Sequence, residues 1–161
     1  MIEYIKSMRK MVGHAPILIC GASVIVVNKS GELLLQKRRD NGCWGYHGGC
    51  IELDEIAEEA AKRELFEETG LNANSLELFG VFSGPDMHYV YPNGDEVSNA
   101  DIVYICRDWM GEIKPDLSEV GELRFFAPDK IPENISPPVI KPLKAYIEKN
   151  GQKAKGGMAC D

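Results

Sequence analysis

Apolar and polar residues alternate along the first forty residues in a way that predicts one helix and a hairpin. In residues 2–12 the apolar side chains recur at helical spacing, which predicts an amphipathic helix. Residues 17–27 form an apolar, β-branched run of the kind found in strands covered on both faces. The turn-forming residues 28–31 follow it, and residues 32–37 are expected to return as a second strand.

The second half of the chain continues with short apolar runs separated by turns. The expected strands are residues 76–82, 87–91, 97–106 and 123–126, and Pro-Asn-Gly-Asp at 92–95 is the strongest hairpin signal. A last apolar period predicts a helix over residues 139–149. A mixed sheet with helices packed on it is an α/β sandwich. We expect one domain over residues 1–150 and a flexible tail over residues 151–161, which contain three glycines and no apolar period.

Between these halves, a segment that is expected to be helical from near Glu55 carries three carboxylates close together. Glu64, Glu67 and Glu68 have i, i+3 and i+4 spacing, so they share an arc of about 100° on the helix surface. Their mutual repulsion disfavours an isolated helix, which indicates a compensating positive charge. Oxygen ligands of this kind suit Mg²⁺, although a solvated acidic face is the other interpretation of such spacing.

The residues around the carboxylates support a special role. Arg63 can reach Glu67 at i+4, and Gly70 stands where a helix usually ends in a left-handed residue. The whole pattern resembles the Nudix box at each of its defined positions, namely Gly49, Glu55, Arg63, Glu64, Leu65, Glu67, Glu68, Gly70 and Leu71.

The resemblance implies a fold and an activity. Nudix proteins are α/β/α sandwiches with a mixed sheet, and they hydrolyse the diphosphate linkage of a nucleoside diphosphate joined to another group, with Mg²⁺ or Mn²⁺. By the resemblance, Glu64, Glu67 and Glu68 bind metal, and a backbone carbonyl of Gly48 or Gly49 often adds a ligand. Arg63 braces one of the glutamates. Glu55 supports the loop and the helix.

A carboxylate must also accept a proton from the attacking water. Glu68 is one candidate. Many Nudix enzymes place a further glutamate in a later loop, which here indicates Glu119, with Glu122 second. The sequence does not decide between Glu68 and Glu119.

Residues before the box are the candidates for substrate contact. Arg38 or Arg39 could clamp phosphate with a guanidinium fork, or the charged run could be a solvated strand end. Trp44 is either core or a wall of the pocket. Gly48 and Gly49 would allow the backbone to approach a phosphate. The family commonly has proline where this chain has His47, which we interpret as structural.

Composition narrows the class of protein. The net charge of −7 argues against nucleic-acid binding, so a nucleotide-type small molecule is the expected partner. Five cysteines without a CxxC pair fit neither a disulfide framework nor a zinc site, so reduced thiols in a cytoplasm are expected. The apolar run at residues 15–27 is too short to span a bilayer. No membrane association is therefore expected.

Two other functions are compatible with parts of the pattern. A regulatory module could bind a nucleotide or ADP-ribose without cleaving it, although such relatives tend to lack box carboxylates that are all present here. An isomerase of prenyl diphosphates would need a catalytic cysteine, for which Cys43 and Cys50 give a faint hint. The second half of the substrate stays open among nucleoside triphosphates, ADP-ribose, dinucleoside polyphosphates and nucleotide sugars. A homodimer is possible.

Overall fold

The computed structural model describes residues 3–115 and 120–156, and side chains within residues 4–115 and 120–150. Its strands form one eight-stranded mixed sheet whose central order is β3-β2-β1-β7-β5. The strands are β1 (Ile17–Val27), β2 (Leu33–Arg38), β3 (Trp44–Gly45), β4 (His47–Cys50), β5 (Asn72–Phe82), β6 (His88–Val90), β7 (Glu96–Met110) and β8 (Val120–Phe126). The helices are α1 (Glu3–Val12), α2 (Ala57–Thr69) and α3 (Pro137–Gly156), with a 3-10 turn at Pro85–Met87.

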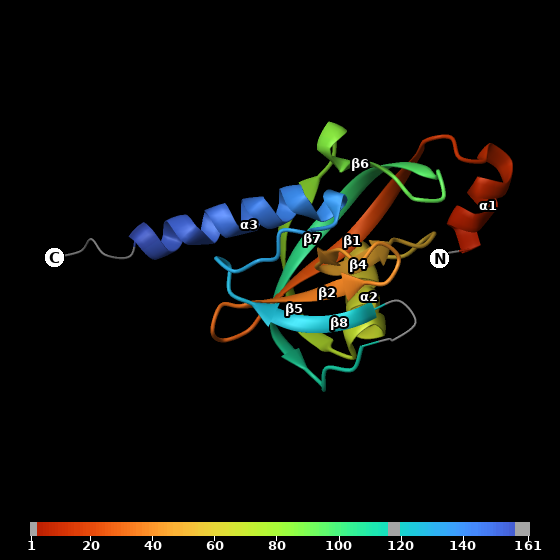
Figure 1. The fold of residues 1–161 in the computed structure, drawn as a ribbon. Coiled ribbons are helices and arrows are strands. Elements are labelled where there is room, and N and C mark those ends of the chain that lie inside the picture. The colour runs from red at the N-terminus through yellow and green to blue at the C-terminus, as the bar shows by residue number, and fades with distance from the viewer. Residues whose placement is uncertain (1–2, 116–119, 157–161) are drawn as a thin grey trace.

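Strand β1 organises the sheet (Figure 1). It runs parallel to β7 along most of its length, with Ile17 opposite Val97 and Val26 opposite Cys106. On its other side it pairs first with β4 and then with β2, both antiparallel. The short β4 strand is thus part of the sheet beside β1, and α2 packs against both of these strands.

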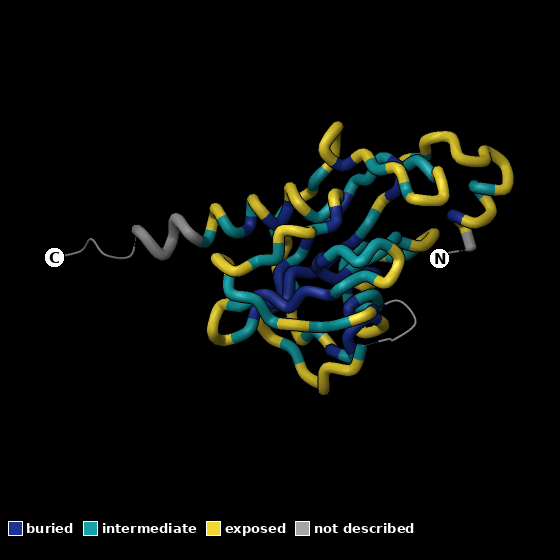
Figure 2. The backbone as a smooth tube through the Cα atoms, in the orientation of Figure 1, coloured by how far each residue is buried: buried dark blue, intermediate teal, exposed yellow. Residues whose placement is uncertain are grey.

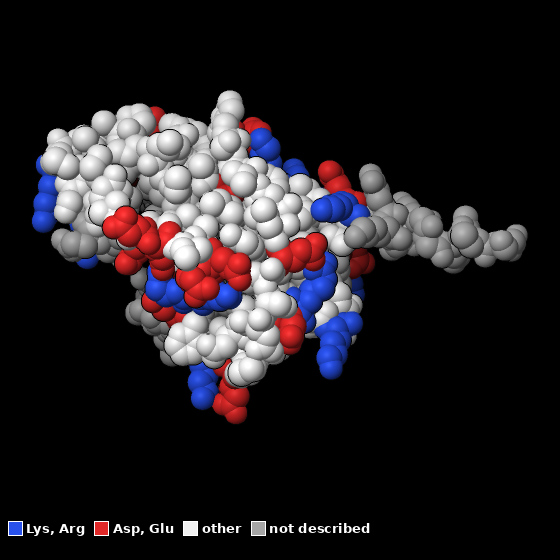
Figure 3. Space-filling view, turned by 180° about the vertical axis from the view of Figure 1, so that it is seen from behind, with Lys and Arg blue, Asp and Glu red and all other residues white. Residues whose placement is uncertain are grey.

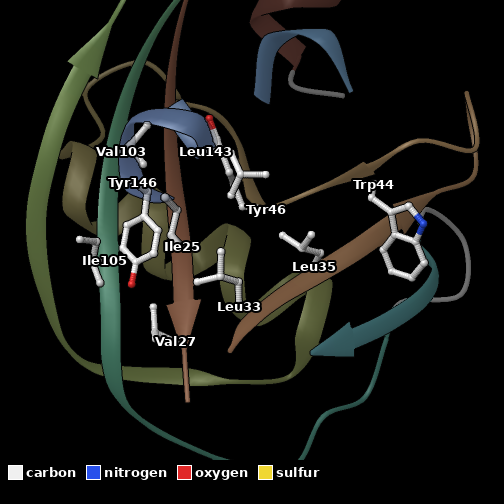
Figure 4. Close-up of a cluster of buried hydrophobic side chains, with 10 residues drawn as sticks. All are labelled: Ile25, Val27, Leu33, Leu35, Trp44, Tyr46, Val103, Ile105, Leu143 and Tyr146. Atoms are coloured by element: carbon white, nitrogen blue, oxygen red, sulfur yellow. The ribbon is translucent and has the colours of Figure 1, made fainter. Parts of the chain in front are cut away.

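The two faces of the sheet carry separate cores. Because side chains alternate along a strand, Ala22, Val24 and Val26 of β1 face α2. Ile25 and Val27 face the opposite way and pack with side chains of α3 (Figure 4). The amino-terminal part of this second face is covered by α1, where Ile5 packs on Ile19 and Val97. Figure 2 shows the buried residues gathered in the strands between these helices and the exposed residues at turns.

This architecture confirms the expected α/β sandwich with a mixed sheet. Element positions agree with the sequence pattern, and several ends differ. Strands β5 and β7 are longer than expected, because residues 72–75 and 108–110 pair with each other. Helix α3 continues to Gly156, so residues 151–156, which we assigned to a tail, are helical. The box helix begins at Ala57 rather than near Glu55, because Ile56 is in extended conformation.

Within the described residues, no helix combines the length and the hydropathy that crossing a membrane would require.

Candidate active site

Helix α2 is fixed on the sheet by its small residues. Ala60, Ala61 and Leu65 are fully buried against β1, which they approach closely because the alanines form no ridge. Gly70 ends the helix in the left-handed region, at φ 76°, and its N–H donates to the carbonyl of Phe66 at 2.8 Å. This packing of α2 on β1 turns the arc of Glu64, Glu67 and Glu68 toward β4.

Two of the three predicted carboxylates meet the glycine pair of β4. The N–H of Gly48 donates to Oε2 of Glu68 at 3.0 Å. A methyl group placed on Gly49 would lie 2.5 Å from Oε1 of Glu64, closer than real side chains come. Glycine at position 49 thus allows the carboxylate of Glu64 to lie directly against the strand, and the backbone N–H of Gly48 holds that of Glu68.

The third predicted carboxylate is farther out. The side chain of Glu67 is 56% exposed, whereas only 8% of the surface of Glu68 is accessible. Among the residues that the structure describes, no group of three or more His, Cys, Asp or Glu side chains is arranged to hold a metal ion. The three carboxylates share an arc, as expected, but do not converge on one point.

Arg63 contacts Glu64 and Glu67 as well as Glu55. Its guanidinium donates to both oxygens of Glu55, at 2.8 and 3.0 Å, and to Oε1 of Glu64 at 2.7 Å. Contact with Glu67, the partner expected from the i+4 spacing, is longer at 3.3 Å. Arg63 also donates to the carbonyl of Cys50 at 3.2 Å, which ties the helix to the end of β4. Glu55 is therefore the main partner of Arg63, with Glu64 and Glu67 as further partners.

The charged side chains of this network shift one another's pKa values. Hydrogen bonds to Glu55 raise the pKa of Arg63, and the Arg63 hydrogen bond lowers the pKa of Glu55. Glu64 behaves differently: burial raises its pKa, and the nearby charges of Glu68 and Glu67 raise it further, against the opposing effect of Arg63. Burial beside Glu68 and Glu67 thus disfavours the charged form of Glu64. The chemistry of these carboxylates fits a hard divalent cation, which would favour their charged form.

A histidine that we interpreted as structural lies directly beneath Glu68. His47 is completely buried, and its Nδ1 lies 3.5 Å from Oε2 of Glu68. Neither ring nitrogen has a hydrogen-bond partner within the described part of the chain. The sequence showed that this chain has His47 where the family commonly has proline, but it did not indicate that His47 would contact Glu68.

The predicted substrate-binding residues fall into two groups. Arg38 is paired with Asp40: hydrogen bonds to that carboxylate, at 2.9 and 2.7 Å, mainly raise the pKa of Arg38, and the charge of Glu68 adds a smaller effect. Arg39 is exposed at the start of the following turn. Trp44 is only 6% exposed and packs edge-on against Phe126 in the core. That placement favours packing, one of its two expected roles, over a pocket wall.

Glu119 lies outside the described residues. Glu122, the second choice, is on β8 and pairs with Arg124.

A second polar group was missed by sequence reasoning. Asp101 of β7 is buried and accepts hydrogen bonds from the hydroxyls of Ser23, at 2.8 Å, and Tyr46, at 3.0 Å. Burial raises the pKa of Asp101. This group lies on the face of the sheet opposite α2; the parallel register of β1 and β7 brings Ser23 near Asp101, and Tyr46 reaches it from the residue between β3 and β4.

The face of the molecule seen from behind carries both acidic and basic side chains. Acidic side chains gather on this face with basic side chains against them, on a surface that is otherwise largely uncharged (Figure 3).

Comparison with known proteins gives a consistent result. A model of the NUDIX domain matches residues 19–146. Among curated proteins, the chain is 34% identical over 112 residues to a candidate 8-oxo-dGTP diphosphatase of Bacillus subtilis, over 70% of this chain and 68% of that protein. It is 37% identical over 111 residues to an ADP-ribose pyrophosphatase of Methanocaldococcus jannaschii, over 67% of this chain and 62% of that protein. The chain thus spans roughly two thirds of the length of these relatives.

Solved structures agree with these relatives. A MutT NUDIX hydrolase from Burkholderia pseudomallei superposes with a TM-score of 0.67 at 27% identity, over 80% of this chain and 97% of that one.

Proposed function

Because the chain belongs to the Nudix hydrolase family, we propose that it is a metal-dependent pyrophosphohydrolase that cleaves the diphosphate linkage of a nucleoside diphosphate joined to another group. The observation that carries this proposal is the placement of Glu64 and Glu68 against the Gly48–Gly49 backbone. The names of the two curated relatives support nucleoside triphosphates and ADP-ribose-like compounds as the substrate class.

Glu64, Glu67 and Glu68 would hold Mg²⁺ or Mn²⁺, with the backbone of Gly48 beside them. When bound, the cation supplies charge neutralisation for the phosphate oxygens and a lower pKa for water. The guanidinium of Arg63, which contacts Glu64 and Glu67, is already shared with Glu55, so a bound cation would supply the further positive charge.

We assign the remaining roles, orientation of the carboxylates and proton transfer, to side chains of the same site. Arg63 and Glu55 form a brace that fixes the orientation of Glu64 and joins α2 to β4 through the carbonyl of Cys50. Glu68 is held by the N–H of Gly48 at one oxygen, so its other oxygen is the candidate to accept the proton of the attacking water. Glu119 stays the second candidate for this base.

Arg38 is positioned to bind phosphate. Its guanidinium presents two nitrogens to the carboxylate of Asp40, and a phosphate could replace that carboxylate in the same geometry. Arg39, next to it and exposed, is the alternative clamp.

The two other functions considered from the sequence are less well supported. Every box carboxylate is present, whereas a binding module without activity has no need of them. Burial, with the charge of Glu64, raises the pKa of the Cys50 thiol to about 11, which makes it a poor nucleophile at neutral pH and disfavours the isomerase.

One assay tests the proposal. The purified protein is incubated with dGTP, 8-oxo-dGTP, ADP-ribose, a dinucleoside polyphosphate and a nucleotide sugar, with Mg²⁺, with Mn²⁺ or with EDTA. Products are converted to phosphate by a coupled phosphatase or pyrophosphatase and measured colorimetrically. We expect turnover of at least one substrate with metal and none in EDTA. Tight binding of a nucleotide without turnover would instead identify a binding module.

A further inference from the structure

The residue that the proposed mechanism leaves unused is His47, and its environment is unusual. The side chain is completely buried, yet both ring nitrogens are without a hydrogen-bond partner within the described residues. Burying polar nitrogens without partners is costly, comparable to losing hydrogen bonds, and native proteins rarely do so without a functional reason.

The strand register fixes where the ring points. His47 pairs with Val24 of β1 and Gly49 with Ala22, while Gly48 pairs with Ser23. Because side chains alternate along a strand, His47 and Gly49 face α2, where Glu68 and Glu64 lie, and Gly48 faces the other way. The imidazole therefore lies under Glu68 because of the sheet itself and not because of a mobile loop.

Two donors then approach the same oxygen of Glu68. The N–H of Gly48 donates to Oε2 at 3.0 Å, and Nδ1 of His47 lies 3.5 Å from that oxygen, just too far for a good hydrogen bond. A small movement of the carboxylate toward the strand would complete the second bond. The other oxygen, Oε1, has no hydrogen bond within the described part of the chain, so it is left for a cation or a water.

From this geometry we infer that His47 is a positioning residue for Glu68, whose Nδ1–H holds Oε2 and so reserves Oε1 for the metal or the attacking water. In this tautomer Nε2 carries no proton, so Nε2, the buried nitrogen that stays without a partner, is an acceptor rather than a donor. Groups that orient a metal-binding carboxylate in this way typically change metal affinity or activity by about 10–100-fold when removed. This inference rests on the proposed function, because it needs Glu68 to be at the metal site.

Matched variants separate a hydrogen-bonding role from a packing role. His47→Phe keeps a planar ring without an N–H. His47→Asn places an amide N–H near the position of Nδ1, and His47→Leu has the size of asparagine without a donor. His88→Phe is the control, since His88 is a partly exposed histidine that pairs with Glu96 at 3.0 Å, away from the carboxylates.

Three properties of the full chain are measured for each variant: Mn²⁺ affinity by electron paramagnetic resonance of free Mn²⁺, the unfolding temperature in EDTA, and kcat and KM. We expect His47→Phe to bind Mn²⁺ about 10–100-fold more weakly and to have a lower kcat. Its unfolding temperature should be equal or higher, because the unpartnered nitrogens are gone. His47→Asn should recover most of the Mn²⁺ affinity, whereas His47→Leu should not, and His88→Phe should match the wild type.

The outcomes are distinct. Wild-type Mn²⁺ affinity in His47→Phe would overturn the inference. Equal Mn²⁺ affinities in His47→Asn and His47→Leu would also overturn it. If His47→Phe does not fold, the comparison of His47→Asn with His47→Leu still decides. A parallel fall of Mn²⁺ affinity and unfolding temperature in all three His47 variants would overturn it in favour of packing. If the wild type itself binds no Mn²⁺, the proposed function fails before the role of His47 is reached.

Discussion

Adding one methyl group at Gly49 should reduce activity while leaving the fold intact. In Gly49→Ala the new Cβ would lie 2.5 Å from Oε1 of Glu64, 2.6 Å from Cδ and 2.7 Å from Oε2, whereas ordinary contacts begin at 3.4 Å. The clash involves only the end of a flexible side chain, so the backbone can stay in place. The carboxylate must retreat by about 1 Å, and misplacement of a catalytic group on that scale can cost about 100-fold in rate.

The stability cost of Gly49→Ala should be small. The displaced carboxylate strains its rotamer and weakens the 2.7 Å hydrogen bond from Arg63, each worth about 1 kcal/mol. For a chain of this length, about 2 kcal/mol lowers the unfolding temperature by roughly 4–8 °C. Gly49→Ala should therefore lose most of its activity but little of its stability.

The assay is phosphate release with the best substrate of the panel, together with thermal unfolding followed by circular dichroism. Gly80→Ala is the matched control, because its new Cβ would make only an ordinary contact with Phe82, at 3.4 Å. We expect kcat/KM to fall about 100-fold in Gly49→Ala and to stay near wild type in Gly80→Ala. A fully active Gly49→Ala enzyme would refute the claim that Glu64 must lie against this strand.

Three further predictions concern stability. Gly48→Ala should destabilise the fold by about 3 kcal/mol in urea unfolding, because its Cβ would lie 2.6 Å from backbone atoms of β1 that cannot move aside; wild-type stability would contradict the described strand geometry. Arg63 lowers the pKa of Glu55 below 4.5, so the stability that Glu55 contributes is present above pH 4.5 and is lost as the pH falls through the lowered value. Unfolding free energies measured as the pH is lowered below 4.5 should therefore fall more steeply for the wild type than for Glu55→Gln, and parallel curves would argue against the pairing. Burial raises the pKa of Glu64, so the ionised form of Glu64 costs stability above that raised pKa. Glu64→Gln should therefore be inactive yet at least as stable as the wild type at neutral pH. A marked fall of the unfolding temperature in Glu64→Gln would show that the pairing with Arg63 outweighs burial.

Local patterns in the sequence were sufficient for the parts of the site that lie on one helix. The spacing of Glu64, Glu67 and Glu68 places them on one arc whatever the helix packs against, and Gly70 ends the helix by its own backbone preference. The hairpins were predictable for the same reason, since turn residues and alternation act over a few positions. The turn at 92–95, for example, joins Val90 and Glu96 as expected.

Contacts between distant segments could not be read in this way. Arg63 contacts Glu67 at i+4, as expected, but the sequence did not indicate that the loop before α2 also brings Glu55 to it, through a turn in which Asp54 has φ 63°. The contact of His47 with Glu68 and the burial of Asp101 depend on the register of β1 with β4 and β7. No short-range pattern encodes a register between strands that far apart in the chain.

The most direct test of the account is the turnover number of Glu68→Gln with Mg²⁺ and the best substrate of the panel. The amide keeps the size of the side chain and can still accept the hydrogen bond from Gly48, so the fold should be retained, which thermal unfolding verifies. Loss of the carboxylate should lower kcat by about 1,000-fold, the scale expected for a group that binds the cation or takes the proton. A folded Glu68→Gln protein that hydrolyses the substrate at the wild-type rate would contradict the account at its centre.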